Sequence, residues 1–395
     1  MSLSDHWNLP HPGEIRSIQI MRVTSIVFIL SLITIGSIEI HAAKPNTPIK
    51  VGLIMEPTAS HVSGYLDVLA ARKGIGSVAV AVPDKDMLEN AKLKLGNRFH
   101  GNGFMNAKQM LAKVQPALTI ITTEGAHAPA AIRAALEVGS HVLTEKPSCT
   151  KLEQFEELAL LANKKKLHLM LAMATRSGSA LKKARQLITD GTIGKPYSVS
   201  MVWIADQTRL TTKAYHQSWL ADPTRAGGGK LIYHGIHYLD AIQHLLNDPI
   251  RDITGFTQNV GGQPIRVEDS AVVSFRFASG ATGTHNTGYY LDKGKQSEIR
   301  IWGSHGWLRL AHLEGKPLQW YSTRPSAPRG IQEFTYTDLS KTYHLFFQDA
   351  IDAVGNKTPP PITTNESLRA LRVVFAAYKA AAIGQTQRVN PSKTQ

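Results

Sequence analysis

The sequence predicts an α/β protein of two parts: a parallel sheet flanked by helices, then an α+β domain with a largely antiparallel sheet. Short apolar runs alternate with helical stretches in the first half of the chain, which is typical of a parallel sheet. After about residue 172 the runs alternate apolar and polar residues with a period of two, which is typical of antiparallel strands. The length of 395 residues suits two domains rather than one.

The first part of the pattern predicts strands at 49–54, 78–82, 118–121, 141–143 and 167–171. Apolar residues at helical spacing predict helices at 61–71, 87–95, 128–138 and 152–163. Gly139 follows the third helix, where glycine commonly ends a helix. Ligands of such sheets bind at the carboxyl ends of the strands. We therefore expect one rim to gather residues 56–60, Asp84, Thr122, Thr123, Glu145 and Lys146.

Asp84 lies at the end of the second predicted strand, where an acid that binds a ribose commonly lies. The alternative is a solvated turn residue, because Pro83-Asp84 is also typical of turns.

The second part predicts helices at 181–188 and 231–246 and strands at 197–204, 271–277, 280–287, 298–302 and 307–310. Aromatic and polar residues gather between Trp203 and Trp219, among them Arg209, Lys213 and Tyr215. This loop is interpreted either as a site for a sugar ring or as an ordinary surface loop. Arg176 and Lys213 are candidates to meet an acidic sugar.

The formal net charge is +14, which indicates either plain solubility or an anionic ligand or surface. Nucleic acid is disfavoured as a partner, because Lys and Arg are spread along the chain and no nucleic-acid-binding motif accompanies them. The single cysteine, Cys149, excludes an internal disulfide framework and a multi-cysteine metal site.

The chain has a candidate export signal near its start. Met21-Arg22 precedes an apolar run at 23–38, and His41-Ala42-Ala43 follows. This order is typical of a Sec-type signal peptide and predicts a periplasmic or extracellular protein. An N-terminal membrane anchor is the alternative. Met21 is a second candidate start, with residues 1–20 as an upstream extension.

Three segments together carry a family resemblance. Residues 134–147 read as a helix, a Gly, a strand and Glu-Lys-Pro; residues 191–194 read Gly-Thr-Ile-Gly; residues 227–240 contain Gly-Gly-Gly and then Gly-Ile-His-Tyr-Leu-Asp. In this order and spacing, the chain resembles the Gfo/Idh/MocA oxidoreductases over about residues 49 to 390.

The resemblance implies a Rossmann-like NAD(P)-binding domain at 44–171 and a substrate domain at 172–390, whose sheet often supports homo-oligomers. It implies hydride transfer between NAD or NADP and a sugar, polyol or related carbonyl compound.

Lys146 would contact the substrate hydroxyl, His237 would act in proton transfer, and Asp240 would be structural. Tyr233 stands where the family has an Asp, and a tyrosine can also do acid–base work. The predicted catalytic residues are therefore Lys146, Tyr233 and His237. The predicted cofactor-binding residues are Ser60, His61, Asp84, Thr122, Thr123, His127, Glu145 and Lys146.

These residue types suit the chemistry, because a His titrates near neutrality and a Lys ammonium stabilises a developing alkoxide. The cluster of Tyr233, His234, His237 and Asp240 is disfavoured as a metal site: on a regular helix Tyr233 and His237 share a face and His234 points elsewhere.

One departure supports an alternative function. The family's Gly-x-Gly-x-x-Gly positions hold Met55, Pro57 and Ser60, and Glu56 adds a negative charge where phosphates would lie. The alternative is a non-redox carbohydrate-active enzyme, or a sugar-binding protein, on a scaffold that has lost nucleotide binding.

Overall fold

A computed structural model describes residues 48–58 and 61–389 of the chain. The export-signal prediction and the cofactor prediction at Ser60 lie outside the described residues. No helix within the described ranges is long and apolar enough to cross a membrane.

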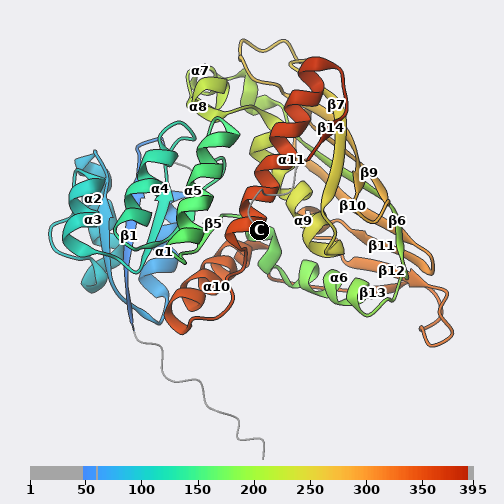
Figure 1. The fold of residues 1–395 in the computed structure, drawn as a ribbon, viewed down its shortest axis with the longest axis horizontal. Coiled ribbons are helices and arrows are strands. Elements are labelled where there is room, and N and C mark those ends of the chain that lie inside the picture. The colour runs from blue at the N-terminus through green and yellow to red at the C-terminus, as the bar shows by residue number, and fades with distance from the viewer. Residues whose placement is uncertain (1–47, 59–60, 390–395) are drawn as a thin grey trace, which may run out of the picture. The chain divides into compact units, whose positions relative to one another are not determined.

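The first sheet has five parallel strands in the order β2-β1-β3-β4-β5. These are β1 (Ile49–Met55), β2 (Ile75–Ala81), β3 (Leu118–Thr122), β4 (His141–Thr144) and β5 (Leu169–Leu171). Their helices are α1 (Val62–Ala71), α2 (Lys85–Leu95), α3 (Ala107–Val114), α4 (Ala128–Glu137) and α5 (Leu152–Lys164). Figure 1 shows these helices around the sheet. The predicted parallel α/β sheet is confirmed, and Gly139 has the positive φ of a helix-ending glycine. Helix α3 is not among the predicted elements.

The second sheet has nine strands in the order β13-β12-β11-β10-β6-β9-β8-β7-β14. Its long strands are β6 (Pro196–Asp206), β7 (Ile250–Gln258), β8 (Ser270–Phe277), β9 (Thr282–Leu291) and β10 (Lys295–Gly303). The shorter ones are β11 (Gly306–Leu310), β12 (Leu318–Ser322), β13 (Gln332–Phe334) and β14 (Gln387–Arg388). Within this second sheet, as far as its strands are described, only the β6–β9 pair is parallel, so the predicted largely antiparallel sheet is confirmed.

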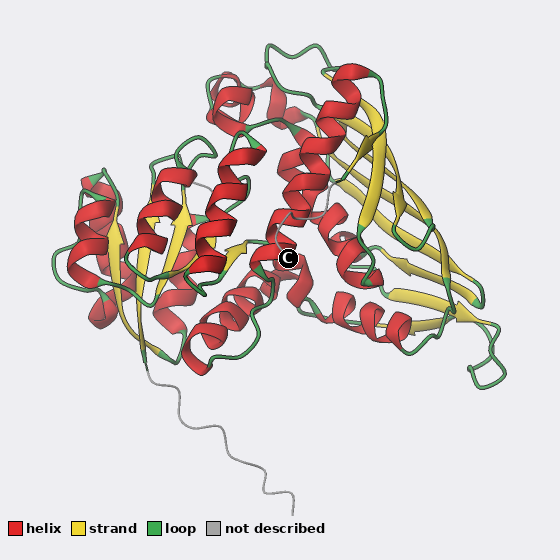
Figure 2. Ribbon diagram, in the orientation of Figure 1, coloured by secondary structure: helices red, strands yellow, loops and turns green. Residues whose placement is uncertain are grey.

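Helices cover one face of the second sheet (Figure 2). They include α6 (Ser179–Thr189), α9 (Ile236–Leu246) and α11 (Thr364–Ile383). Helix α10 (Thr342–Asn356) packs against α1 and the turn η2 (Ala174–Ser177). Alternation along β8 places Ala271, Val273 and Phe275 in the core and leaves the intervening residues exposed on the other face.

Helix α11 joins the two sheets. It contacts β5 and α5 on one side and β7 and α9 on the other. Strand β5 is an edge strand, and α11 satisfies its backbone: Leu169 N–H donates to Thr364 Oγ1 and Leu171 N–H donates to Ser367 Oγ.

Candidate active site

Lys146 lies just after β4, at the rim predicted from the sequence. Its ammonium donates to the backbone oxygen of Tyr233 over 2.7 Å and lies 3.5 Å from the centre of the Tyr233 ring. The residue is almost fully buried, and burial lowers the pKa of its ammonium below the ordinary lysine value. A lysine whose pKa is lowered can donate a hydrogen bond and can also give up its proton more readily than an exposed lysine.

Glu145 faces the first domain rather than the second. Its Oε1 accepts from the Tyr65 hydroxyl at 2.6 Å and lies 3.0 Å from His61 Nδ1. Burial alone would raise the pKa of Glu145, but hydrogen bonding and charge from His61, with Lys146, hold that pKa below its usual value. The carboxylate therefore ties the Lys146 segment to α1.

A π-helical turn, η5 (Leu231–Gly235), carries the predicted residue Tyr233 and leads into α9, which carries His237. The rings of His234 and His237 both approach Trp203 of β6, with centroids 4.7 and 6.0 Å away. The expectation that His234 points elsewhere is wrong. A π turn inserts a residue relative to 3.6-residue spacing, and such turns are common at functional sites. Lys146, Tyr233, His234 and His237 are thus brought together.

Lys230 precedes the π turn and is fully buried. Its ammonium lies 3.3 Å from His234 Nδ1, and the Tyr289 hydroxyl lies 3.2 Å from the same nitrogen. The ammonium also faces the ring of Tyr289 at 4.4 Å. Burial first, and then the charges of Arg209 and Lys146, lower the pKa of Lys230 to about 6. Burial likewise lowers the pKa of His234. Neutral and charged forms of Lys230 are therefore both accessible near pH 6.

Arg209 lies in the turn η3 (Thr208–Thr211), which follows β6. Its guanidinium carbon is 5.1 Å from the Tyr215 ring centre and 5.6 Å from the centres of both Tyr233 and Tyr289. Burial lowers the pKa of Arg209, but the neighbouring tyrosines raise it overall, so the side chain remains a cation.

The turn after β1 contains a carboxylate network where the family's glycines would stand. Glu56 accepts from the Glu124 backbone N–H at 3.1 Å and contacts His127 Nδ1 at 2.8 Å. Glu124 in turn accepts from Thr58 and forms a two-point ion pair with Arg225, whose Nε–Oε2 distance is 2.7 Å. We name Glu56, Glu124, His127 and Arg225 the acidic turn.

Residues of the second domain also contact the acidic turn and the residues beside it. Trp219 Nε1 donates to the backbone oxygen of Thr58 at 3.2 Å, and Ala126 N–H donates to that of Arg225 at 3.0 Å. A dinucleotide's pyrophosphate normally uses free backbone N–H groups and close backbone approach at this position. Here the Glu124 N–H is occupied by Glu56, and Pro57 has no N–H to offer. Glu56 and Pro57 therefore do not provide the phosphate contacts that glycines provide at these positions.

Of the other predicted cofactor residues, four lie near the strand ends of the first sheet and one, Asp84, caps a helix. Thr122 and Thr123 are buried where β3 ends, His127 belongs to the acidic turn, and His61 precedes α1 with a positive φ of 62°. Asp84 caps α2, with Oδ1 accepting from the Met87 N–H at 2.8 Å. Its carboxylate is thus engaged with the helix, and its role toward a ribose stays a prediction.

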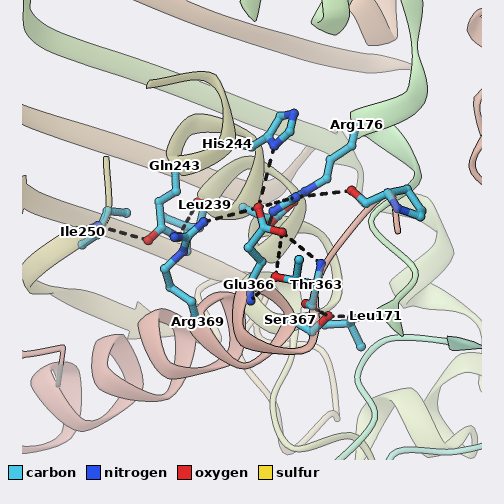
Figure 3. Close-up of polar contacts among 12 residues, drawn as sticks. Leu171, Arg176, Leu239, Gln243, His244, Ile250, Thr363, Glu366, Ser367 and Arg369 are labelled. Carbon is cyan, nitrogen blue, oxygen red and sulfur yellow. Dashed lines mark hydrogen bonds and ion pairs between the residues drawn. The ribbon is translucent and has the colours of Figure 1, made fainter. Parts of the chain in front are cut away.

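Arg176 does not lie free to meet a ligand, contrary to expectation. It donates through Nε and Nη2 to both oxygens of Asp240, at 2.8 and 2.7 Å, and through Nη1 to Glu366 at 2.8 Å. Figure 3 shows Arg176 and His244 converging on Glu366 of α11. Burial would raise the pKa of Glu366, but His244 and Arg176 hold it far below its usual value. This network binds η2, α9 and α11 together, which agrees with a structural role for Asp240. Lys213, the other candidate, is exposed at the start of α7 (Lys213–His216).

No group of three His, Cys, Asp or Glu side chains within residues 48–58 and 61–389 is arranged to hold a metal ion.

Comparison with known proteins agrees with this fold. The oxidoreductase family with an NAD-binding Rossmann fold matches residues 61–173, and the GFO/IDH/MocA C-terminal domain matches residues 181–309. The chain is 25% identical to a 1,5-anhydro-D-fructose reductase of Ensifer adhaerens, over 69% of this chain and 79% of that protein. It is 23% identical to a myo-inositol 2-dehydrogenase of Thermotoga maritima, over 67% and 77% of the two chains.

Solved structures share the architecture. An NAD-binding oxidoreductase of Klebsiella pneumoniae superposes with a TM-score of 0.76 at 20% identity, covering 88% of this chain and 100% of that one. A levoglucosan dehydrogenase in complex with NADH and levoglucosan superposes with a TM-score of 0.75 at 17% identity, covering 87% and 100%. The fold and the two matches define an oxidoreductase with a Rossmann-type domain. The chain belongs to the Gfo/Idh/MocA family.

Proposed function

We propose that this chain is an NAD(P)-dependent oxidoreductase that interconverts a hydroxyl and a carbonyl group on a sugar, a polyol or a related compound. The observation that carries the proposal is the buried Lys146, which reaches from the end of β4 to the π turn that holds Tyr233. Family membership and relatives named as sugar and inositol oxidoreductases support it.

In this proposal the nicotinamide, when bound, supplies the carbon that gives or takes hydride. Lys146 donates a hydrogen bond to the reacting oxygen and stabilises the charge that develops there. Its lowered pKa also lets it hold or release the proton of that hydroxyl. His237 and Tyr233 are the further acid–base candidates, held beside Trp203 and Lys146 respectively.

The acidic turn favours a second candidate function. Because Glu56 places a carboxylate in the turn after β1, where a phosphate would lie, the scaffold would in this case serve redox-neutral carbohydrate chemistry or sugar binding without a nucleotide. Calorimetric titration of the full chain with NAD⁺ and NADP⁺ separates the two. Micromolar binding, followed by reduction of the nicotinamide with a panel of sugars and polyols, supports the oxidoreductase. Absence of binding at millimolar cofactor supports the redox-neutral alternative.

We further propose that residues 21–43 direct export of the protein. The support is the order of basic, apolar and small residues in the sequence. The test is N-terminal sequencing of the protein recovered from the culture medium, the periplasm and the membrane of an expressing bacterium. Cleavage near Ala43 supports a signal peptide, and an uncleaved membrane-bound chain supports an anchor.

We also propose that the helix-free face of the nine-stranded sheet joins copies of the chain. The support is its exposed apolar residues: the Phe256 side chain is 80% exposed, and Val272 and Trp302 are also exposed. Light scattering with size-exclusion chromatography is the test, and Phe256→Asp should lower the measured mass to that of a monomer.

A further inference from the structure

We propose that the sugar-like substrate of this chain carries an anionic group, a carboxylate or a phosphate, recognised by Lys146, Arg209 and Lys230. We name these three residues the cationic cluster. The inference rests on the proposed function for the rest of the substrate, and it adds the charge that the substrate must carry.

Two tyrosine rings each lie close to two of the three basic groups. The charged groups of Lys146 and Arg209 are 3.5 and 5.6 Å from the centre of the Tyr233 ring. Those of Arg209 and Lys230 are 5.6 and 4.4 Å from the centre of the Tyr289 ring. The cations come from the end of β4, from η3 and from the residue before η5, so segments far apart in the sequence converge here.

No carboxylate among the described residues forms an ion pair with a member of the cationic cluster. The nearest acids are engaged elsewhere. Glu145 is bound by Tyr65 and His61. Glu268 accepts from the backbone N–H groups of Gly229 and Leu231, at 2.7 and 2.9 Å, and from Tyr378. The charges of Glu145 and Asp206 act on Lys146 and Arg209, but neither carboxylate forms an ion pair with them, so the positive charge of the cluster is only partly compensated within the protein.

Tyrosine faces compensate such charges only in part, since a cation–π contact is worth about 0.5 to 2 kcal/mol. Burial, and then the charges of Arg209 and Lys146, lower the pKa of Lys230, so without a ligand the cluster favours loss of the Lys230 proton, and a bound anion would favour its protonated form. A ligand carboxylate or phosphate would supply the missing charge. Guanidinium and ammonium groups bind both oxyanions well, and the tyrosines and Trp203 offer flat surfaces for a sugar ring.

A buried arginine elsewhere in the described chain shows the contrast. Arg176 is paired with Asp240 and Glu366. The chain thus neutralises a buried cation where its role is structural, and leaves cations without carboxylates beside Lys146.

Calorimetry on the full chain tests the proposal with two charged probes, D-glucuronate and D-glucose 6-phosphate, and two neutral ones, D-glucuronamide and D-glucose. At least one charged probe should bind ten times more tightly than its neutral counterpart. Arg209→Gln and Lys230→Met should each abolish this preference, while Arg209→Lys retains part of it. Arg329→Gln, which removes one exposed positive charge far along the chain, is the matched control and should leave the preference unchanged. Thermal unfolding verifies that each variant is folded.

Equal binding of charged and neutral probes, or failure of both charged probes to bind at millimolar concentration, overturns the proposal. Displacement of the charged probe by NAD⁺ also overturns it, because the cluster would then serve the cofactor's phosphates. Charge-dependent binding without nicotinamide reduction would leave the cationic cluster standing and refute the oxidoreductase. Turnover of neutral sugars alone would support the oxidoreductase and refute the anion-binding role of the cationic cluster.

Discussion

The acidic turn and the cationic cluster treat charge in opposite ways. In the acidic turn, Arg225 and His127 meet Glu124 and Glu56, and each charged group has a protein partner. In the cationic cluster, Arg209 and Lys230 lie beside tyrosine rings and an imidazole, and neither forms an ion pair with a carboxylate of the described residues. A polar network that is complete within the protein is stable without a ligand, whereas an uncompensated cluster gains most from one.

The difference separates the two ends of the proposed active site. At the cofactor-phosphate end, the described donors Glu124 N–H and Arg225 are bound by carboxylates. At the substrate end, Arg209 and Lys230 form no ion pair with a carboxylate of the described residues. Binding of a nicotinamide cofactor would therefore have to displace or neutralise Glu56, while binding of an anionic substrate would need no such rearrangement.

The largest effect is expected at Lys146, which belongs to the substrate end. Lys146→Met should lower kcat/KM by about 10³-fold, roughly 4 kcal/mol, because both the hydrogen bond to the reacting oxygen and the proton exchange are lost. Steady-state kinetics on the best substrate of the panel measures it. Lys92→Met, on the exposed side of α2, is the control. A decrease below tenfold would show that Lys146 has no direct part in the reaction.

Removing the buried arginine should cost about as much, but in stability. Arg176→Met leaves the Asp240 carboxylate buried without its partner, which should lower the free energy of unfolding by about 3 to 5 kcal/mol. Urea unfolding measures the change. Arg133→Met breaks the exposed pair with Glu157 and should cost less than about 1 kcal/mol. Arg176→Met combined with Asp240→Leu should recover part of the loss, and absence of recovery would contradict the uncompensated-charge explanation.

Lys230 should make the free energy of unfolding depend on pH, and Lys230→Met should remove this contribution. Its pKa of about 6 in the folded protein lies below the ordinary value of 10.5, so the unfolded chain binds more protons between these pH values. The free energy of unfolding of the wild type should then rise with pH across this window, by up to about 1.4 kcal/mol per unit. Lys230→Met lacks this contribution. Its free energy of unfolding relative to that of the wild type should therefore decrease from pH 6.5 to pH 8.5, as measured by urea unfolding. A constant difference would show that Lys230 keeps its proton.

Substitution of Glu56 tests whether its negative charge weakens cofactor binding. Glu56→Gln removes the negative charge but keeps an oxygen that can accept from the Glu124 N–H. The dissociation constant for NAD⁺ should fall about tenfold, roughly 1.4 kcal/mol, because a carboxylate no longer opposes the pyrophosphate. Calorimetry measures the constant, and Glu153→Gln on the exposed start of α5 is the control. Unchanged or weaker NAD⁺ binding would show that the Glu56 charge is not the obstacle.

The features that the sequence predicted are those set by local pattern. Apolar runs and two-residue alternation were enough for the five strands of the first sheet and for β6, β8, β9, β10 and β11 of the second, whereas β7, β12, β13 and β14 were not predicted. The order of short motifs was enough for the family. Lys146 could be placed at the rim because parallel strands end on the same edge of a sheet.

The features that the sequence did not predict depend on contacts between distant segments. The π turn brings His234 into the site, yet 231–246 reads as one regular helix. Arg176 was a candidate ligand-binding residue in the sequence, but Asp240 and Glu366, which are 64 and 190 residues away, bind it in the structure. The aromatic stretch around Arg209 was the available signal for the cationic cluster, and its partner Tyr289 comes from another strand.

Asp84 combines both kinds of inference, because its position suits a ribose and its sequence context suits a turn. Its carboxylate caps α2, so Asp84→Ala should lower the free energy of unfolding by about 1 kcal/mol while leaving the NAD⁺ dissociation constant unchanged. Asp84→Asn, whose side-chain oxygen can still accept from the Met87 N–H, should restore most of the stability. Urea unfolding and calorimetry on the same samples measure the two quantities. A marked loss of NAD⁺ affinity in both variants, with stability retained in Asp84→Asn, would instead assign the carboxylate to the ribose. The cap would then be its secondary role.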